Sequence, residues 1–390
     1  MMKIALLTDG ITPYVVGGMQ KHSFNLAKYF TFHGVEVTLF HFVEKNTFLV
    51  SNKELNKILF GEKSNYTVKS YCYHFPNSLK FPGHYIYNSY RYSKLIFNSI
   101  KPILNEFDFI YSKGFCGWKL ILKKKRGIVS PNIGVNFHGF EMWQKPPTIK
   151  AYFQSLLLRP FIKWNIKNCD FVFSYGSKIS EIIKKRGINN NSIIESPSGI
   201  DVEFIRKLDS IKNSQKRKFL FIGRDERRKG IKELSEVIKN LNLEILNIEF
   251  HFIGQIKNEN KLKSKNIYYY GLIKNTEKIV KIIDKMDVLI CPSYSEGMPN
   301  VIIEAMARGL AIIATNVGAV SLLIDNKVGW LIDKDNLILS LNKSINKACH
   351  LENDKLLLMK NSAIEKIIKL YRWDEVIKDL IKKLNNGIAR

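Results

Sequence analysis

The sequence predicts an α/β protein of two Rossmann-like, doubly wound domains that face each other across a deep interdomain cleft. Three observations predict this fold class. The chain has 390 residues, 45% of them hydrophobic, which is enough for two or three domains with sizeable cores. Short apolar runs alternate with longer helical stretches, as in βαβ units around a parallel sheet. The alternation breaks at the turn-rich segment 196–201 and then restarts.

In the first half of the chain, runs of strand length are followed by helical stretches. The expected strands are Lys3–Thr8, Val35–Val43, Phe107–Tyr111, Ile133–Phe137 and Phe171–Ser174. The expected helices are Met19–Phe32, Tyr85–Lys101, Trp118–Lys125, Thr148–Asn168 and Ser177–Arg186. Such alternation places the strands in one parallel sheet with helices on both faces.

The second half repeats the pattern without repeating the sequence. Its expected strands are Phe219–Ile222, Glu249–Ile253, Ile267–Tyr270, Val288–Cys291, Ala311–Thr315 and Gly329–Ile332. Its expected helices are Ile231–Leu241, Thr276–Lys285, Asn300–Arg308, Asn336–Lys347, Asp354–Leu370 and Trp373–Leu384. We therefore expect an N-terminal domain over residues 1–205, a C-terminal domain over 206–372 and a separate last helix within 373–390.

The chain is strongly basic. Lys and Arg outnumber Asp and Glu by 61 to 35, a formal net charge of +26, with 27 basic and 10 acidic residues in 1–190 against 34 and 25 in 191–390. The surplus is typical of proteins with an anionic partner, such as nucleic acid, a membrane surface or an acidic substrate. AT-rich codon usage would produce the same surplus, since only 12 of the basic residues are Arg.

Cysteine usage and hydropathy indicate the compartment. The five cysteines form no C-x-x-C pair, which disfavours a disulfide framework or a zinc site and favours a reducing cytosol. The most apolar window, 301–324, is interrupted by Glu304, Arg308 and Asn316, so we expect a helix and a strand there, with no spanning helix. Any membrane contact would then be peripheral.

The sharpest motif is the pair Glu296 and Glu304 within residues 293–309. Pro299 suits the first turn of a helix and Gly309 its C-terminal end, so a helix over 299–308 is expected directly after a strand. Its N-terminus, with free N–H groups and partial positive charge, suits a phosphate. The carboxylates would accept hydrogen bonds from a transferred sugar and a ribose. A capping acid and an ordinary helix glutamate would have the same spacing.

A second motif runs from Gly223 to Gly230, where a strand ends and a helix begins. Arg224 and Lys229 would lie at the carboxyl end of the strand, the ligand side of such a sheet. Together they could neutralise a leaving diphosphate without a metal. The alternative is a solvated basic turn, to which we assign the neighbouring residues 227 and 228.

Three weaker motifs complete the set. Gly17 and Gly18 would let backbone approach a ligand, although they form no G-x-G-x-x-G fingerprint; a tight turn explains them equally well. His138 follows a strand and would touch substrate or be a structural histidine. Asp333-Lys334-Asp335 has a D-x-D spacing but lies far from the other motifs, so we expect a solvated turn and no metal site.

The helical stretch 148–167 mixes large apolar side chains with Arg159, Lys163 and Lys167. One interpretation is a core-facing helix kinked by Pro160. The other is an interfacial helix on anionic lipid, which would suit a lipid-linked acceptor.

Taken together, these motifs resemble a family 4 retaining glycosyltransferase of the GT-B fold over nearly the whole chain. Glu296-x7-Glu304 matches the E-x7-E signature of that family. The order of the motifs is also the family's, namely Gly17-Gly18, His138-Gly139, 197–201, Gly223-Arg224 with Lys229, and the two glutamates. The resemblance implies a cytoplasmic hexosyltransferase-type enzyme for cell-surface polysaccharide or glycolipid synthesis at the inner face of the cell membrane. It would transfer a sugar, with retention, from a UDP- or GDP-sugar to a glycan or lipid-linked acceptor and require no metal.

The resemblance also implies residue roles. Arg224 and Lys229 would hold the donor diphosphate, Glu304 the ribose, and Glu296 the donor sugar near the reacting carbon. The implied catalytic set is Glu296, Arg224, Lys229 and His138, and the implied donor-binding set adds Gly17, Gly18, Leu272, Gly297, Met298, Pro299, Asn300, Val301 and Glu304. The last helix would return to the first domain. Gln20 and the segment 318–321 stand where the family often has an acid, which leaves the sugar and acceptor open.

Two other functions fit parts of the pattern. A nucleotide-sugar epimerase can share the two-domain fold and would need no acceptor. A non-catalytic glycosyltransferase-like subunit or a basic nucleic-acid binder would tolerate loss of the two glutamates, and we find no nucleic-acid-binding module.

Overall fold

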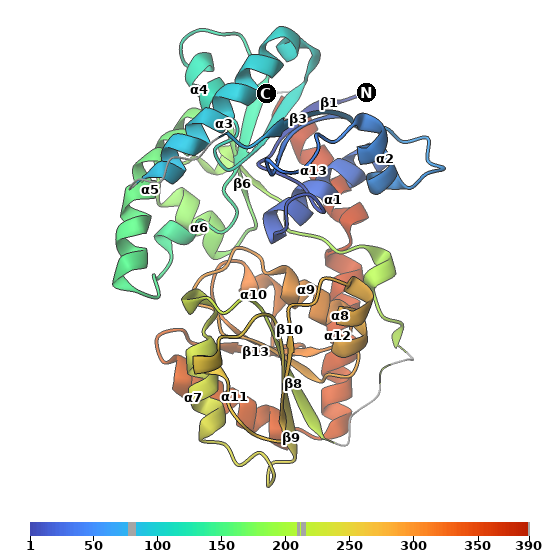
Figure 1. Ribbon diagram of the computed structural model, residues 1–390, viewed down its shortest axis with the longest axis vertical. Helices are drawn as coiled ribbons and strands as arrows, with labels where there is room; N and C mark the ends of the chain where they lie inside the picture. Colours follow the sequence, from blue (N-terminus) through green and yellow to red (C-terminus); the bar gives the residue numbers. More distant parts are fainter. Residues whose placement is uncertain (77–82, 209–210, 212–215, 389–390) are drawn as a thin grey trace. The chain divides into compact units, whose positions relative to one another are not determined.

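The structure, a computed structural model, describes residues 1–76, 83–208, 211 and 216–388. The chain divides into two compact units (Figure 1). Unit 1 consists of Met1–Met142, Gln154–Pro197 and Trp373–Arg390, and unit 2 of Trp143–Phe153 and Ser198–Arg372. Each unit contains a parallel sheet flanked by helices, which confirms the expected doubly wound α/β fold class.

Unit 1 is built on a seven-stranded sheet of order β3-β2-β1-β4-β5-β6-β7. The strands are β1 Lys3–Leu7, β2 Glu36–Val43, β3 Lys69–His74, β4 Phe109–Lys113, β5 Asn132–Asn136, β6 Phe171–Ser174 and β7 Ile193–Glu195. The strand order reverses between β1 and β4, and open α/β sheets generally bind ligands at the carboxyl ends of the strands on either side of such a reversal. β4 runs two residues beyond the strand expected from its apolar run, which places Lys113 at this edge.

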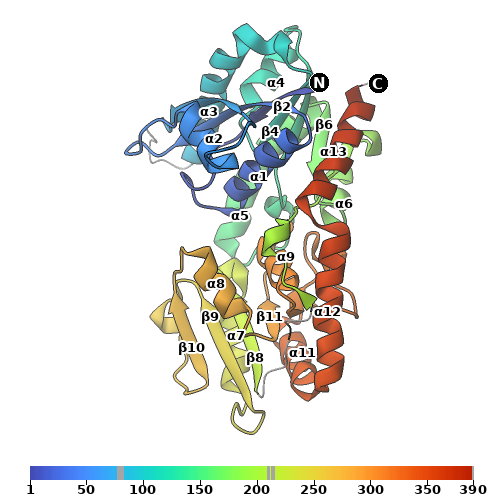
Figure 2. The ribbon, with the colours of Figure 1, turned by 90° about the vertical axis from the view of Figure 1, so that its right-hand side faces the viewer.

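Helices cover both faces of that sheet. They are α1 Gly18–Phe32, α2 Asn52–Phe60, α3 His84–Ile100, α4 Trp118–Lys124, α6 Lys178–Lys184 and α13 Trp373–Ile388, together with α5 Ile149–Asn168, which begins in the segment assigned to unit 2. The last helix, α13, packs beside α1 and lies along the sheet in Figure 2. Its buried face joins the same hydrophobic core as β1 and β2, through Trp373, Val376, Ile377, Leu380 and Leu384.

Unit 2 has a six-stranded sheet of order β10-β9-β8-β11-β12-β13. The strands are β8 Arg217–Ile222, β9 Ile248–Ile253, β10 Ile267–Gly271, β11 Val288–Cys291, β12 Ala311–Thr315 and β13 Gly329–Ile332. The helices are α7 Ile231–Lys239, α8 Thr276–Ile283, α9 Asn300–Ala307, α10 Val320–Leu323, α11 Leu337–His350 and α12 Asn353–Leu370. Here the order reverses between β8 and β11.

The sequence patterns do not predict four of these elements. β3 is an edge strand in which no residue is fully buried, so it lacks an apolar run. α2 buries only Leu55 and Leu59. β7 and α10, of three and four residues, are too short for periodicity to reveal.

A buried ion pair lies at the amino ends of two central strands of the unit 2 sheet. Lys360 of α12 places its Nζ 2.7 Å from Asp287 Oδ1, and both side chains are almost completely buried. The other carboxylate oxygen, Oδ2, accepts the N–H of Lys218 at 2.9 Å. Burial lowers the pKa of Lys360, an effect that the attraction of Asp287 opposes. The pair therefore joins α12 to the amino ends of β8 and β11.

Within the part of the chain that the structure describes, no helix combines the length and the apolarity that crossing a bilayer requires.

Candidate active site

The candidate site in unit 2 lies on two loops at the carboxyl ends of β8 and β11. These strands are neighbours where the strand order reverses, the place where open α/β sheets bind ligands. The N–H of Tyr294 donates to the carbonyl oxygen of Arg228 at 2.7 Å, so the two loops are tied together through their backbones. β11 ends at Cys291, where burial raises the thiol pKa to about 11, so the thiol stays neutral beside the charged groups.

Two glycines permit the close packing of these loops. A Cβ on Gly230, whose φ is +70°, would lie 2.0 Å from the carbonyl oxygen of Pro292. A Cβ on Gly318, with φ +56°, would lie 2.2 Å from the carbonyl oxygen of Glu296. Next to it, the N–H of Ala319 donates to Gly297 at 2.8 Å. Three loops therefore meet backbone to backbone around Glu296, with no room for side chains at either glycine.

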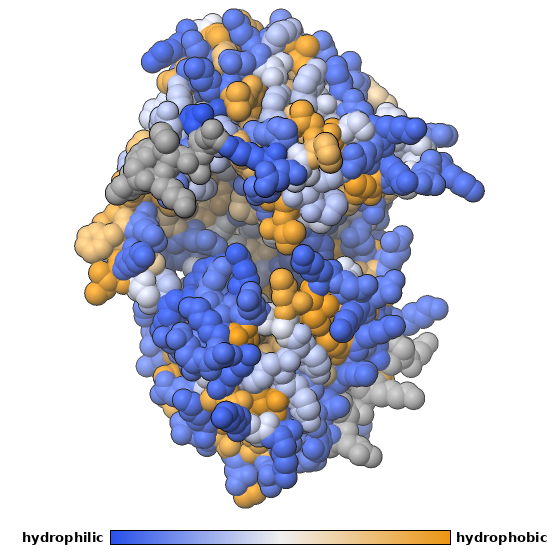
Figure 3. All heavy atoms as spheres, viewed as in Figure 1, coloured by the Kyte–Doolittle hydropathy of each residue, from blue (hydrophilic) through white to orange (hydrophobic). Residues whose placement is uncertain are grey.

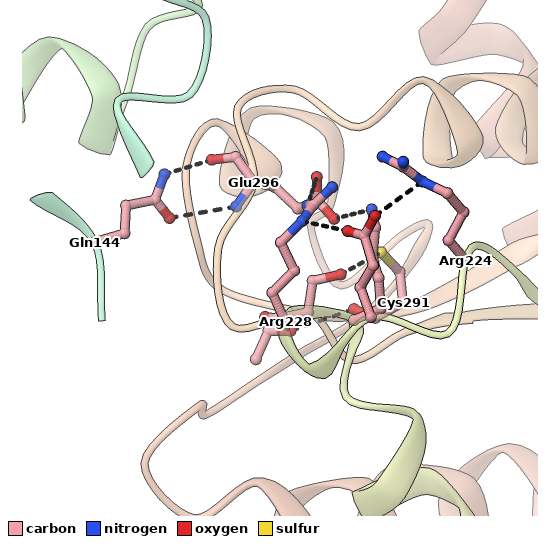
Figure 4. A network of polar contacts seen from close by, with 9 residues as sticks. Gln144, Arg224, Arg228, Cys291 and Glu296 are labelled. Atoms are coloured by element: carbon pink, nitrogen blue, oxygen red, sulfur yellow. Dashed lines mark hydrogen bonds and ion pairs between the residues drawn. The ribbon is translucent and has the colours of Figure 1, made fainter. Parts of the chain in front are cut away.

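The charged side chains on these loops form one network of alternating sign (Figure 4). The Nζ of Lys229 lies 2.6 Å from Glu296 Oε1, and Arg228 Nη1 lies 3.7 Å from Oε2 of the same carboxylate. Glu226 accepts from Arg228 Nε at 2.8 Å and pairs with Arg224 Nε at 3.0 Å. The Arg224 side chain is 77% exposed, whereas Glu296 is buried.

The structure thus brings together the three predicted charged residues of this loop pair, Arg224, Lys229 and Glu296. Sequence reasoning missed Arg228, which it assigned to a solvated turn. The neighbouring Arg227 is a different case, because it makes two hydrogen bonds to Glu233 of α7 at 3.0 and 2.6 Å. Residues 227–229 form a 3₁₀ turn, which sends successive side chains in different directions.

The helix that follows the second loop begins at the later of the two expected starts, 299 and 300. α9 starts at Asn300, and Pro299 is the N-cap residue. The turn-rich segment 196–201 packs against this helix start, since the N–H of Ser198 lies 3.2 Å from the sulfur of Met298 and its hydroxyl bonds Asn300 Oδ1 at 3.1 Å. Gly297 and Val301 flank these residues, so the predicted segment 297–301 is the backbone of the helix start, with the amide polarity that favours anions.

The two remaining predicted donor contacts stand on other elements of unit 2. Glu304 is in the second turn of α9 and is half-buried. Leu272 follows β10 and is 67% exposed.

The predicted residues of unit 1 lie near a second polar cluster at the carboxyl edge of its sheet. Gly17 is the N-cap residue of α1 and Gly18 its first residue. Gln20, which stands where the family often has an acid, donates from Nε2 to Asp9 Oδ1 at 3.1 Å. Burial raises the pKa of Asp9. Gln20 therefore supplies a neutral donor to a partly buried carboxyl group.

The centre of this cluster is Lys113, which sequence reasoning missed. Its side chain is 1% exposed, and its Nζ lies 2.8 Å from His22 Nδ1 and 3.5 Å from His138 Nε2. Burial holds the pKa values of the lysine and both histidines well below their usual ranges. The attraction of Asp9 opposes this shift for Lys113, although no ion pair of Lys113 within 4.0 Å occurs across residues 1–76, 83–208, 211 and 216–388. The cluster therefore favours neutral imidazoles around a buried amine.

His138 is fixed on both sides. Its Nδ1 lies 2.7 Å from the hydroxyl of Tyr175, while Nε2 faces Lys113. Its backbone has φ +57°, and Phe140 has φ +48°, conformations that non-glycine residues rarely adopt and that concentrate at functional sites. Both ring nitrogens thus have protein partners in this arrangement.

No set of three or more His, Cys, Asp or Glu side chains suited to a metal ion occurs among the described positions.

Comparison with known proteins gives a family match for unit 2. Residues 204–366 match the family model described as glycosyl transferases group 1. Full-length structural matches extend to both units: sucrose-phosphate synthase from Thermosynechococcus elongatus has a TM-score of 0.77 at 16% identity, covering 100% of both chains. Anabaena HepE in complex with UDP and glucose has a TM-score of 0.66 at 13% identity, covering 99% of this chain and 100% of that one. These likenesses show that the chain has the GT-B fold.

Curated relatives match part of the chain. The putative teichuronic acid biosynthesis glycosyltransferase TuaC of Bacillus subtilis is 28% identical, over 51% of this chain and 50% of its own. The capsular polysaccharide biosynthesis glycosyltransferase CapM of Staphylococcus aureus is 29% identical over 40% and 47%. A Campylobacter jejuni relative, named N,N'-diacetylbacillosaminyl-diphospho-undecaprenol alpha-1,3-N-acetylgalactosaminyltransferase, is 29% identical over 56% and 61%. The chain thus spans about half the length of these relatives, and unit 2 has the sequence pattern of a group 1 glycosyltransferase.

Proposed function

We propose that this chain is a retaining glycosyltransferase of family 4 type. It would transfer a sugar from a nucleoside diphosphate sugar to a hydroxyl of a glycan or lipid-linked acceptor in cell-surface polysaccharide synthesis. The observation that carries the proposal is the pairing of Lys229 with Glu296 beside the start of α9, within the segment that matches the group 1 family. The relatives named for capsular polysaccharide and for a diphospho-undecaprenol substrate support the acceptor class.

The donor diphosphate would bind where positive charge is available. Arg224 is exposed and can turn toward a phosphate in bidentate geometry. Lys229 is held by Glu296. A diphosphate would compete with that carboxylate for the ammonium group of Lys229. The N-terminal amides of α9 add partial positive charge. These groups would stabilise the negative charge that develops on the diphosphate as the glycosidic bond breaks.

The remaining roles follow from position in the same unit. Glu304 would accept hydrogen bonds from the ribose and Glu296 from the donor sugar. In the proposed step, the acceptor oxygen bonds to the anomeric carbon on the face that the diphosphate leaves, and the acceptor proton passes to a leaving phosphate oxygen. Because Arg224 and Lys229 neutralise that phosphate, we propose that no divalent cation is required, and chelator should leave turnover unchanged.

Contact with an anionic membrane is a further part of the proposal. Along α5, one helical face exposes Ile149, Tyr152, Phe153, Leu156 and Leu157. Apolar side chains gather over this part of the molecule, at the left edge of Figure 3. Lys163 and Lys167 are exposed on the same face at helical spacing. An apolar face flanked by lysines suits a membrane that carries anionic lipid and a lipid-linked acceptor.

The first experiment is a screen of UDP-, GDP- and ADP-sugars for thermal stabilisation, because a ligand at 100 times its Kd stabilises by about 2.7 kcal/mol. With the stabilising sugar nucleotide, Arg224→Ala and Lys229→Ala should each lower kcat by about 10²–10³. Arg227→Ala is the matched control in the same turn and should retain most activity. Near-normal turnover in Arg224→Ala or Lys229→Ala would contradict the proposal, and product formed from the donor alone would favour an epimerase.

A further inference from the structure

The segment Trp143–Phe153 packs with unit 2, although the chain on both sides of it belongs to unit 1. Two adjacent side chains attach it. Gln144 bonds the backbone of Glu296, and Lys145 forms an ion pair with Asp335. The second contact gives Asp335 of the D-x-D turn at 333–335 a partner. The proposed donor site does not include this turn. Gln144, whose partner Glu296 is buried, thus holds this segment more firmly than Lys145, whose ion pair with Asp335 is exposed.

The side-chain amide of Gln144 makes hydrogen bonds to both the carbonyl oxygen and the N–H of Glu296. Gln144 Nε2 donates to the carbonyl oxygen of Glu296 at 2.6 Å, and the N–H of Glu296 donates to Gln144 Oε1 at 3.3 Å (Figure 4). Asn and Gln are the side chains that carry a donor and an acceptor on one planar amide, as a peptide group does. Gln144 therefore pairs with Glu296 as a neighbouring strand would.

This pairing fixes the residue whose carboxylate holds Lys229. The side chain of Glu296 is directed toward Lys229 and Arg228, while its carbonyl group packs against Gly318. Gln144 satisfies the backbone groups of this buried residue. A carboxylate on a loop keeps its direction only as well as the loop backbone is held, and misplacement by about 1 Å is costly in catalysis.

We propose that Gln144 is a positioning residue that acts through Glu296, holding its carboxylate in the geometry that donor transfer requires. The inference rests on the proposed function of unit 2. It predicts that loss of the carboxamide lowers the rate of transfer without weakening the grip on the diphosphate, which Arg224, Lys229 and the α9 start supply.

The first test is Gln144→Leu, which keeps the size of the side chain and removes both hydrogen bonds. Amide hydrogen exchange should be faster at Glu296 than in the wild type, independently of any activity. With the sugar nucleotide found in the screen, kcat should fall about tenfold, the worth of a hydrogen bond of ordinary strength, while the Kd of UDP or GDP changes by less than about twofold. In a Glu296→Ala background, Gln144→Leu should cause less than about a twofold further loss.

The second test uses pH. In Gln144→Glu the ionised carboxylate accepts the N–H of Glu296 but cannot donate to its carbonyl group. Protonation restores the donor, so the rate relative to wild type at the same pH should rise as pH falls from about 8 toward 5, approaching the ordinary Glu pKa of about 4.3. If Gln144 only filled space, the rate of Gln144→Glu relative to wild type would not change with pH. Lys145→Ala, which removes the neighbouring exposed ion pair, is the matched control and should behave as wild type.

The outcomes separate the two proposals. Normal turnover in Lys229→Ala and Glu296→Ala would overturn the proposed function, and the inference with it. Loss of activity in those variants together with wild-type kcat in Gln144→Leu would overturn the inference alone. Additive losses in the double variant would also overturn it, since Gln144 would then act independently of Glu296.

Discussion

Lys113 and Lys360 show how the partner of a buried lysine decides its energetic role. Both residues are 1% exposed, one in each unit. Lys360 pairs with the carboxylate of Asp287, whereas Lys113 contacts two imidazoles. Burial penalises the ammonium of Lys113 more than the attraction of Asp9 favours it, so the pKa of Lys113 falls well below 10.5.

We therefore expect the two lysines to respond differently to substitution by Met. Lys360→Met removes the ammonium that pairs with the buried carboxylate of Asp287, which should cost about 3–5 kcal/mol of unfolding free energy. Lys113→Met leaves two neutral imidazoles without a donor, which should cost about 1–3 kcal/mol. Urea unfolding at pH 7, followed by probes in each unit, measures both. Equal losses of unfolding free energy in the two variants would contradict the claim that the partner of each lysine decides its contribution to stability.

The pH dependence of the free energy of unfolding gives a second test of the Lys113→Met variant. Folded Lys113 binds fewer protons than the unfolded chain, so its contribution to stability rises with pH up to about 10.5. The loss caused by Lys113→Met should therefore grow between pH 7 and pH 10. A difference from wild type that is independent of pH would show that Lys113 keeps its ordinary pKa.

Residues that contact each other across long sequence separations were beyond sequence reasoning. Glu296, Arg224 and Lys229 stand in motifs with local turn signals, so their loops could be placed. Gln144 is 152 residues from Glu296, and Lys113 is 91 residues from His22. No periodicity or composition reports which loops meet. The Arg-Arg-Lys run 227–229 carried a weak signal for Arg228. Successive residues of a tight turn point in different directions, so at least one of the three side chains should point toward the carboxyl ends of the strands.

Among the elements, α5 exposes large apolar residues along its first three turns. Phe153 is 64% exposed and Ile149 78% exposed, whereas Ile162 and Ile166 further along the helix are buried. The sequence left open whether this helix faces a core or a membrane. The structure gives each half a different environment, since the later turns pack inside unit 1 and the early turns do not.

We expect the exposed face of α5 to bind anionic vesicles. The combined variant Phe153→Ser with Leu156→Ser should weaken binding to phosphatidylglycerol vesicles about tenfold or more, because each buried large apolar side chain contributes about 1.5–3 kcal/mol. Vesicle co-sedimentation measures this. Leu358→Ser, at an exposed leucine of α12, is the matched control. Equal binding by all variants, or binding to zwitterionic vesicles alone, would exclude this face as the contact.

At the scale of the whole molecule, the chain passes between its units more than once. The segment 143–153 belongs to unit 2 and α13 to unit 1, so neither unit is one continuous stretch of sequence. Trp373, the first residue of α13, is almost fully buried in unit 1, where its ring stacks on Tyr29 at 5.9 Å between centroids and meets His22 at 5.3 Å. The stability of unit 1 therefore depends on the end of the chain.

Trp373→Ala should accordingly destabilise unit 1 by about 3–5 kcal/mol, the usual cost of removing a large buried aromatic side chain. Scanning calorimetry or protease resistance of each unit separates the effect, and the transition of unit 2 should move little. Leu370→Ala, at an exposed position three residues earlier, should change stability by less than about 0.5 kcal/mol. A loss shared equally by both units would contradict the assignment of α13.

Local sequence patterns predict the alternation of strands and helices, and with it two parallel sheets and the loops that carry Arg224, Lys229 and Glu296. Hydrophobic period, Gly and Pro act over a few residues, so they can be read locally. Three contacts emerge only in the folded chain: Gln144 with Glu296, Lys113 with His22 and His138, and Trp373 with the core of unit 1. These contacts depend on which distant segments pack together, a property of the folded sheet and its crossovers that local patterns do not contain.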